Sequence, residues 1–174
     1  MKLPFKKIAG FTLIELTIYI AILSVITVMV ADSFLILNKG KGGVAAKSEL
    51  NSNLRFVLER MKRDVSSASS LITPNTTAAT SSSLVLVVGA NSISYIIDNN
   101  RIARQVDSQP LEYVSSDRVR ITDMYFSRLE NTNLVLDKKR ISVEINVFAS
   151  YNSNSPDWQY SQNERTSIDL NQDF

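Results

Sequence analysis

A single carboxylate, Glu15, interrupts the apolar stretch Gly10-Phe11-Thr12-Leu13-Ile14-Glu15-Leu16 near the N-terminus of this 174-residue chain. It is the only charged residue between Phe11 and Ala31. A helix rises 1.5 Å per residue, so this segment is long enough to cross a hydrocarbon layer of about 30 Å. A carboxylate at the centre of such a helix costs about 2.5–3.5 kcal/mol on insertion scales, which makes Glu15 a candidate functional residue.

A short basic segment precedes the apolar one. It carries Lys2, Lys6 and Lys7, whereas the residues after the apolar segment carry charges of both signs. Because positively charged flanks stay on the cytoplasmic side of a membrane, we expect the N-terminus in the cytoplasm and the larger part of the chain outside. Residues 11–37 are therefore predicted to form the transmembrane half of an N-terminal helix.

Two ordinary explanations compete for the apolar segment. A cleaved secretory signal has an apolar core of about 7–15 residues and a small-x-small cleavage site, for which Met29-Val30-Ala31 is a poor match. A plain signal anchor has the right length, but it has no use for a glutamate inside the apolar run. Neither explains Glu15.

The composition narrows the possible activities. The chain has no cysteine, which excludes disulfides and cysteine-ligated metals, and no histidine, which removes the commonest general base and zinc ligand. Apart from the three lysines before Gly10, 16 basic side chains stand against 17 acidic ones, so no strongly basic field attracts nucleic acid. We expect a protein without catalytic residues, cofactor or metal.

The helix is predicted to continue beyond the apolar segment, with one weak point. Asn38-Lys39-Gly40-Lys41-Gly42-Gly43 holds three glycines, each costing about 0.8–1.0 kcal/mol relative to alanine, which predicts either a helix bend or a flexible linker. Apolar residues then recur every three or four positions, as in an amphipathic helix. They are Leu50, Leu54, Val57, Leu58, Met61, Val65, Ala68 and Ile72. Segment 38–73 is thus predicted to be a glycine-rich bend and the second half of the helix, which Thr73-Pro74-Asn75 ends.

Residues 74–174 are predicted to form an extracytoplasmic β-sheet domain. We expect strands over 84–88, 92–97, 101–106, 119–126, 141–147 and 166–170, where apolar runs or alternating patterns occur. Asparagine tolerates positive φ, so Asp98-Asn99-Asn100 predicts a tight hairpin turn. The short links favour an antiparallel meander, and the fold class is α+β.

Gly10-Phe11-Thr12-Leu13-Ile14-Glu15-Leu16, with its basic leader, resembles the class III signal of type IV prepilins and type II secretion pseudopilins. In that family a membrane-embedded prepilin peptidase cleaves after the glycine and methylates the new amino terminus. The resemblance implies removal of residues 1–10 at the Gly10–Phe11 bond, N-methylation of Phe11, and pairing of Glu15 with the amino terminus of a neighbouring subunit. It also implies a pilin-like fold, a long N-terminal helix packed on an antiparallel sheet. Pairing makes both charges tolerable in lipid.

The soluble part resembles the minor pseudopilin J and minor pilin W group over Leu54–Val65, Ile93–Arg104 and Leu111–Val114. This resemblance implies a non-catalytic subunit of an initiation or tip complex, in a type IV pilus or a type II secretion pseudopilus. Its partners would be prepilin peptidase, other pilins, the inner-membrane assembly machinery and lipid. Glu15 argues against the K-type pseudopilin, which typically lacks it.

Two other functions stay open. A competence pseudopilin would contact DNA, which the near-neutral outer domain disfavours. A membrane-tethered enzyme would need a serine–lysine arrangement, for which the sequence has no motif.

Three further groups have ordinary explanations. Lys138-Lys139-Arg140, beside Asp137, is expected to be a solvated turn and not an anion site. Asp98-Asn99-Asn100 has too few oxygen donors for calcium. Four aromatic residues are expected to cover the core or a sheet edge, with a partner surface as the alternative. They are Tyr113, Tyr151, Trp158 and Tyr160.

Overall fold

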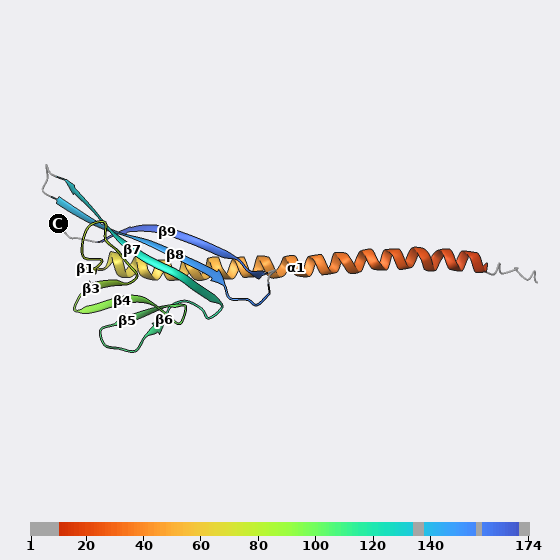
Figure 1. The fold of residues 1–174 in the computed structure, drawn as a ribbon, viewed down its shortest axis with the longest axis horizontal. Helices are drawn as coiled ribbons and strands as arrows, with labels where there is room; N and C mark the ends of the chain where they lie inside the picture. The colour runs from red at the N-terminus through yellow and green to blue at the C-terminus, as the bar shows by residue number, and fades with distance from the viewer. Residues whose placement is uncertain (1–10, 134–137, 156–157, 171–174) are drawn as a thin grey trace, which may run out of the picture. The chain divides into compact units, whose positions relative to one another are not determined.

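The structure is a computed structural model that describes residues 11–133, 138–155 and 158–170. Within this part of the chain it contains one long helix, α1 (Leu13–Ser66), and nine strands (Figure 1). The chain divides into two compact units, Met1–Lys41 and Gly42–Phe174.

In the first unit, α1 is apolar on all sides. Every large apolar side chain between Phe11 and Leu37 is exposed, and the helix is long and apolar enough to cross a membrane. A helix that is apolar all round belongs inside a large core or in a bilayer. The predicted apolar helix is therefore confirmed.

The glycine-rich segment does not interrupt the helix. α1 runs through Gly40, Gly42 and Gly43 without a break, so the linker alternative is not observed. Helix propagation is cooperative, and formed turns on both sides offset the cost of the glycines. The boundary between the two units nevertheless falls here, between Lys41 and Gly42.

The predicted end of the helix is wrong. α1 ends at Ser66, and Ser70–Thr73 forms strand β1 instead of a last helical turn. Serine side chains hydrogen-bond the local backbone and compete with helix, which explains the stop at the serine run after Val65. Leu71 is buried and Ile72 is exposed, the alternation of a strand.

One sheet has five strands in the order β1-β3-β4-β5-β6, and all neighbours are antiparallel. Their bounds are β3 (Leu84–Val88), β4 (Asn91–Asp98), β5 (Arg101–Val106) and β6 (Glu112–Tyr113). The predicted hairpin is confirmed, because Asp98 pairs with Arg101 and the φ angles of Asn99 and Asn100 are 49° and 58°.

A second, four-stranded antiparallel sheet has the order β2-β7-β8-β9. Its strands are β2 (Thr80–Ser81), β7 (Val119–Asn133), β8 (Lys138–Tyr151) and β9 (Ser161–Asp169). β7, β8 and β9 are longer than predicted, since polar residues occupy their exposed positions. The single predicted sheet is corrected to two, because alternation within a strand does not indicate which strands pair.

The core of the second unit lies where α1 packs on both sheets. The predicted helix face is buried, with Leu50, Leu54, Val57, Met61 and Val65 all at most 1% exposed. Side chains of both sheets complete the core, among them Tyr95, Phe126 and Ile145. The fold is an α+β, pilin-like arrangement of a long N-terminal helix packed on antiparallel sheets.

Candidate functional site

Thr12 caps the N-terminus of α1. The Leu16 N–H donates to the Thr12 carbonyl at 3.2 Å, and the Glu15 N–H donates to Thr12 Oγ1 at 3.3 Å. Threonine at the cap with glutamate three residues later is the capping-box spacing, and a carboxylate in the first turn also suits the helix dipole. Sequence reasoning missed this role for Thr12, although the Thr12-x-x-Glu15 spacing was there to find it.

The Glu15 side chain is held by Tyr19, one turn further along. The Tyr19 hydroxyl donates to Glu15 Oε1 at 3.3 Å. The Tyr19 ring meets the Phe11 ring edge-on, with centroids 5.8 Å apart and planes at 68°. Phe11, which precedes α1, therefore lies on the same side as Glu15 and Tyr19 of its first turns.

The structure describes only part of the predicted processing site. It brings Phe11 and Glu15 onto the same exposed face, as above. Gly10, Lys2, Lys6 and Lys7 lie outside the described residues. Cleavage, methylation and pairing therefore stay predictions.

The other hydroxyl groups of the apolar segment bond to the helix itself. Each donates to a backbone carbonyl three or four residues earlier, at 2.8 Å. This satisfies them without water, as a hydrocarbon environment requires. They belong to Thr17, Ser24, Thr27 and Ser33.

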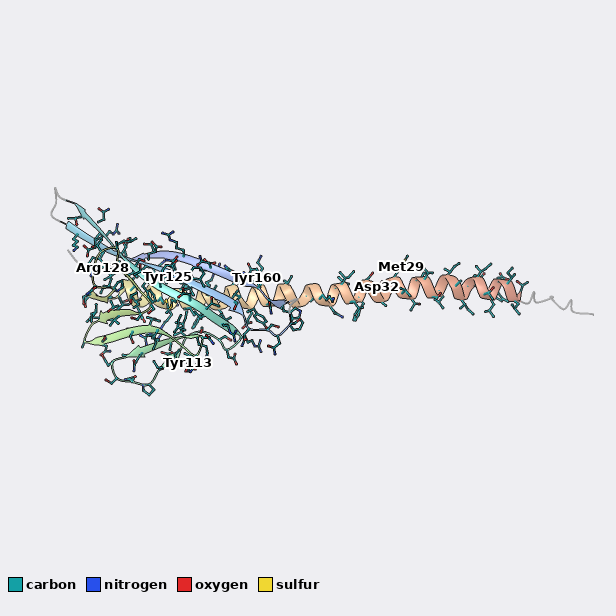
Figure 2. The ribbon with its side chains drawn as sticks, in the orientation of Figure 1. Met29, Asp32, Tyr113, Tyr125, Arg128 and Tyr160 are labelled. Atoms are coloured by element: carbon teal, nitrogen blue, oxygen red, sulfur yellow. The ribbon has the colours of Figure 1, made fainter. Side chains whose placement is uncertain are left out.

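A second carboxylate, Asp32, lies further along the exposed helix, close to Met29 (Figure 2).

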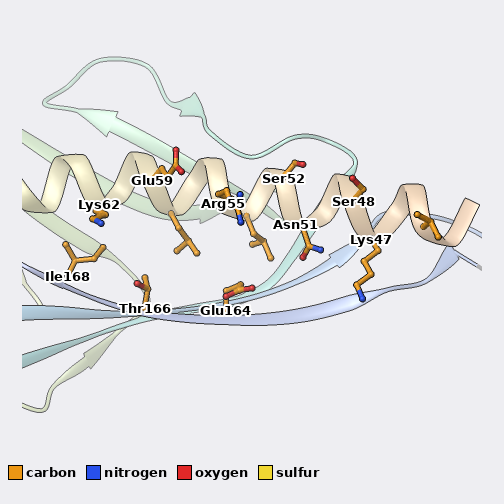
Figure 3. A pocket seen from close by; sticks show the side chains of 13 residues that line it. Lys47, Ser48, Asn51, Ser52, Arg55, Glu59, Lys62, Glu164, Thr166 and Ile168 are labelled. Atoms are coloured by element: carbon orange, nitrogen blue, oxygen red, sulfur yellow. The ribbon is translucent and has the colours of Figure 1, made fainter.

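A groove of about 650 Å³ lies in the second unit, between α1 and β9 (Figure 3). The helix contributes Lys47, Arg55 and Lys62, and β9 contributes Glu164 and Thr166. Serines line it as well, but no serine–lysine hydrogen bond occurs among the described residues that line it. Lys47 instead places its Nζ 5.4 Å from the centre of the Tyr160 ring.

A buried polar cluster joins α1 to the five-stranded sheet. Asp64 Oδ2 accepts hydrogen bonds from the Tyr95 hydroxyl and from Arg104 Nε, each at 2.7 Å. Burial and the bond to Asp64 raise the pKa of Tyr95 well above its ordinary value. Burial alone would lower the pKa of Arg104, but the bond to Asp64 and its charge raise it. This cluster ties the helix to the sheet and is largely shielded from solvent, with the Arg104 and Asp64 side chains 10% and 14% exposed.

The four aromatic residues do not form one patch. Tyr113 lies on β6 under the Arg101 guanidinium, 4.3 Å from the ring centre, whereas Tyr160 stacks with Lys47, well apart from it (Figure 2). Trp158 lies against Gly42 of α1, where a Cβ would overlap the indole. A common partner surface made by all four is therefore not present.

The basic run is corrected as well. Lys139 and Arg140 belong to β8 and pair with Glu130 and Asp169, at 2.7 and 2.9 Å, and do not form a turn. Asp137 lies outside the described residues.

Among the residues that the structure describes, no cluster of three or more acidic side chains that could hold a metal ion occurs.

Comparison with known proteins gives one match. Residues 5–31 match the family model described as the prokaryotic N-terminal methylation motif. No curated protein and no solved structure matches the chain. The chain thus carries a type IV prepilin-like signal, followed by the apolar helix and pilin-like fold described above. The finer resemblance to the J and W group is not among these findings.

Proposed function

We propose that this chain is a minor pilin or pseudopilin, a non-catalytic subunit that assembles with other pilins into a type IV pilus or a type II secretion pseudopilus. The observation that carries the proposal is the methylation-motif match over residues 5–31. The apolar α1 supports it, because the helix leads from that motif directly into the folded second unit.

The precursor is anchored by α1 in the cytoplasmic membrane, with the leader lysines inside and the β-sheet domain outside. Prepilin peptidase hydrolyses the Gly10–Phe11 bond, where glycine has no Cβ to keep the enzyme from the backbone. The new amine of Phe11 is then methylated. Cleavage leaves a cation at the start of a helix that also carries Glu15.

Assembly moves the helix from lipid into a bundle of similar helices. An unpaired amine and an unpaired carboxylate are both costly in hydrocarbon, whereas a pair is much less so. Glu15 therefore selects the position of each subunit by pairing with the Phe11 amine of a neighbour. The assembly machinery and the other pilins are the partners of this step.

The processing step tests the proposal most directly. Wild-type chain and the Gly10→Leu variant are expressed with a prepilin peptidase, and their intact masses are measured. We expect the wild-type protein to lose residues 1–10 and gain one methyl group, and the variant to keep its full mass. Gly40→Leu is the matched control, because a side chain there meets open space. A wild-type protein that keeps its leader, or a Gly10→Leu protein that loses it, would refute the proposal.

A further inference from the structure

Tyr19 contacts both residues to which the proposed function assigns a role in assembly. It follows Glu15 by four residues, a spacing that places both on one helix face, and Phe11 precedes the helix. Its hydroxyl lies 3.3 Å from Glu15 Oε1, and its ring meets that of Phe11 edge-on. The contact to Glu15 is polar and the contact to Phe11 is apolar, so one side chain serves both.

We propose that Tyr19 is a positioning residue that holds the Glu15 carboxylate in place before assembly. The bond occupies Oε1 and leaves Oε2 available to the amine of a neighbouring subunit. The pairing part of this inference rests on the proposed function, whereas the bond itself belongs to the single chain.

The hydroxyl of Tyr19 differs from the others in the apolar segment. Thr17, Ser24 and Thr27 donate to backbone carbonyls of α1, and each is satisfied in that way. Tyr19 is too long to reach back to its own helix backbone, and it donates to a carboxylate instead. A hydrogen bond to a charged acceptor is stronger than one between neutral groups.

An apolar residue at position 19 would suit the bilayer as well as tyrosine does. Phenylalanine has the same ring and would keep the edge-on contact with Phe11. It would leave Glu15 without its donor, and an unpaired carboxylate in hydrocarbon is costly. The feature that tyrosine adds at this position is therefore its hydroxyl group.

Thr12 fixes the other end of Glu15. Its Oγ1 accepts the Glu15 N–H at 3.3 Å, so the backbone of Glu15 is held from the N-terminal side and its carboxylate from the C-terminal side. Fixing a group before it binds reduces the entropy that binding must overcome. Tyr19 completes this arrangement.

The bond is tested on the full chain in lipid nanodiscs, with ¹³Cδ-labelled glutamate and NMR. The Glu15 resonance is identified as the one lost in Glu15→Gln. We expect Tyr19→Phe to shift it and Thr17→Val to leave it in place, because the Thr17 hydroxyl bonds only to the Ile14 carbonyl among the described residues. An unchanged resonance in Tyr19→Phe would overturn the proposal.

The consequence for assembly is measured as the recovery of the subunit in sheared filaments, relative to its amount in the membrane. We expect Tyr19→Phe to lower recovery about threefold, the factor that corresponds to the ~0.6 kcal/mol of an average hydrogen bond within a membrane. Thr17→Val should be recovered like wild type. Equal recovery of Tyr19→Phe and wild type would overturn the positioning role. Absence of the wild-type chain from filaments would instead refute the proposed function, while the NMR result would still report on the bond.

Discussion

Arg104 of β5 places its Nε 2.7 Å from Asp64 Oδ2 of α1, and the two side chains are only 10% and 14% exposed. The Tyr95 hydroxyl donates to the same oxygen. Glu112 gives Arg104 a second, weaker partner at 3.6 Å. Asp64 of the helix thus bonds directly to two strands, β4 and β5, and Arg104 links the cluster to Glu112 of β6.

Asp64→Ala is expected to destabilise the folded second unit by about 3 kcal/mol, the lower end of the cost of breaking a buried ion pair. The reason is that Arg104 would keep a charge, and Tyr95 a hydroxyl, with no full partner inside the protein. Thermal unfolding of the full chain in nanodiscs, followed by near-ultraviolet circular dichroism, measures the change. Glu59→Ala on the exposed side of the same helix is the control and should change stability by less than about 0.5 kcal/mol. Equal effects of the two variants would contradict the role of Asp64.

The second prediction concerns acid. The pKa of Glu130 is lowered from 4.5 to about 2, chiefly by its hydrogen bond with Lys139. Hydrogen bonds with Thr77 and Arg128 lower it further. A carboxyl group whose pKa is depressed by folding stabilises the fold above its unfolded pKa and loses that effect as the pH falls through its folded pKa. Glu130→Gln should therefore lower the melting temperature at pH 6 and have little effect at pH 2. Melting curves of wild type and variant from pH 6 to pH 2 test this, and a constant difference over that range would contradict it.

The third prediction uses the single tryptophan. A Cβ at Gly42 would overlap the Trp158 indole, whereas one at Gly40 would meet no atom within 4 Å. Helix propensity alone favours alanine at both positions by about 0.8–1.0 kcal/mol. We expect Gly40→Ala to be neutral or stabilising, and Gly42→Ala to displace the indole and shift its fluorescence to longer wavelength. Since the chain has one tryptophan, emission reports on this contact alone. Identical spectra for the two variants would contradict the predicted overlap.

The fourth prediction separates insertion from assembly. Glu15→Val should insert and lose its leader like wild type, because valine suits the bilayer at least as well as glutamate. Its recovery in sheared filaments should fall, because the amine of a neighbouring subunit would lose its partner. The conservative Ile14→Val variant, next to it in the sequence, is the control and should assemble normally. Wild-type recovery of Glu15→Val would exclude the pairing role.

Elements set by local pattern could be predicted from the sequence. The apolar helix follows from an uncharged run that is broken only by Glu15, and the β4–β5 hairpin follows from Asn99 and Asn100 between two apolar strands. The capping of α1 by Thr12 was also readable from its spacing to Glu15, although it was not predicted. These features depend on residues within a few positions of one another.

Features set by distant contacts could not be read in this way. Asp64, Tyr95 and Arg104 lie 31 and 40 residues apart in the chain, and nothing in the local sequence links them. The predicted end of α1 is wrong because Ala68 and Ile72 continue the helical spacing of apolar residues, whereas pairing with β3 makes Ser70–Thr73 a strand. The division into two sheets likewise depends on which strands meet in the folded chain.

The unbroken passage of α1 through Gly40, Gly42 and Gly43 has a mechanical consequence. An α-helix rises 1.5 Å per residue and an extended chain about 3.3 Å, so unwinding the six residues 38–43 lengthens the chain by about 11 Å. Three of those six are glycines, which makes this the least costly stretch of α1 to unwind. Under tension the subunit would extend here first, with its buried core intact.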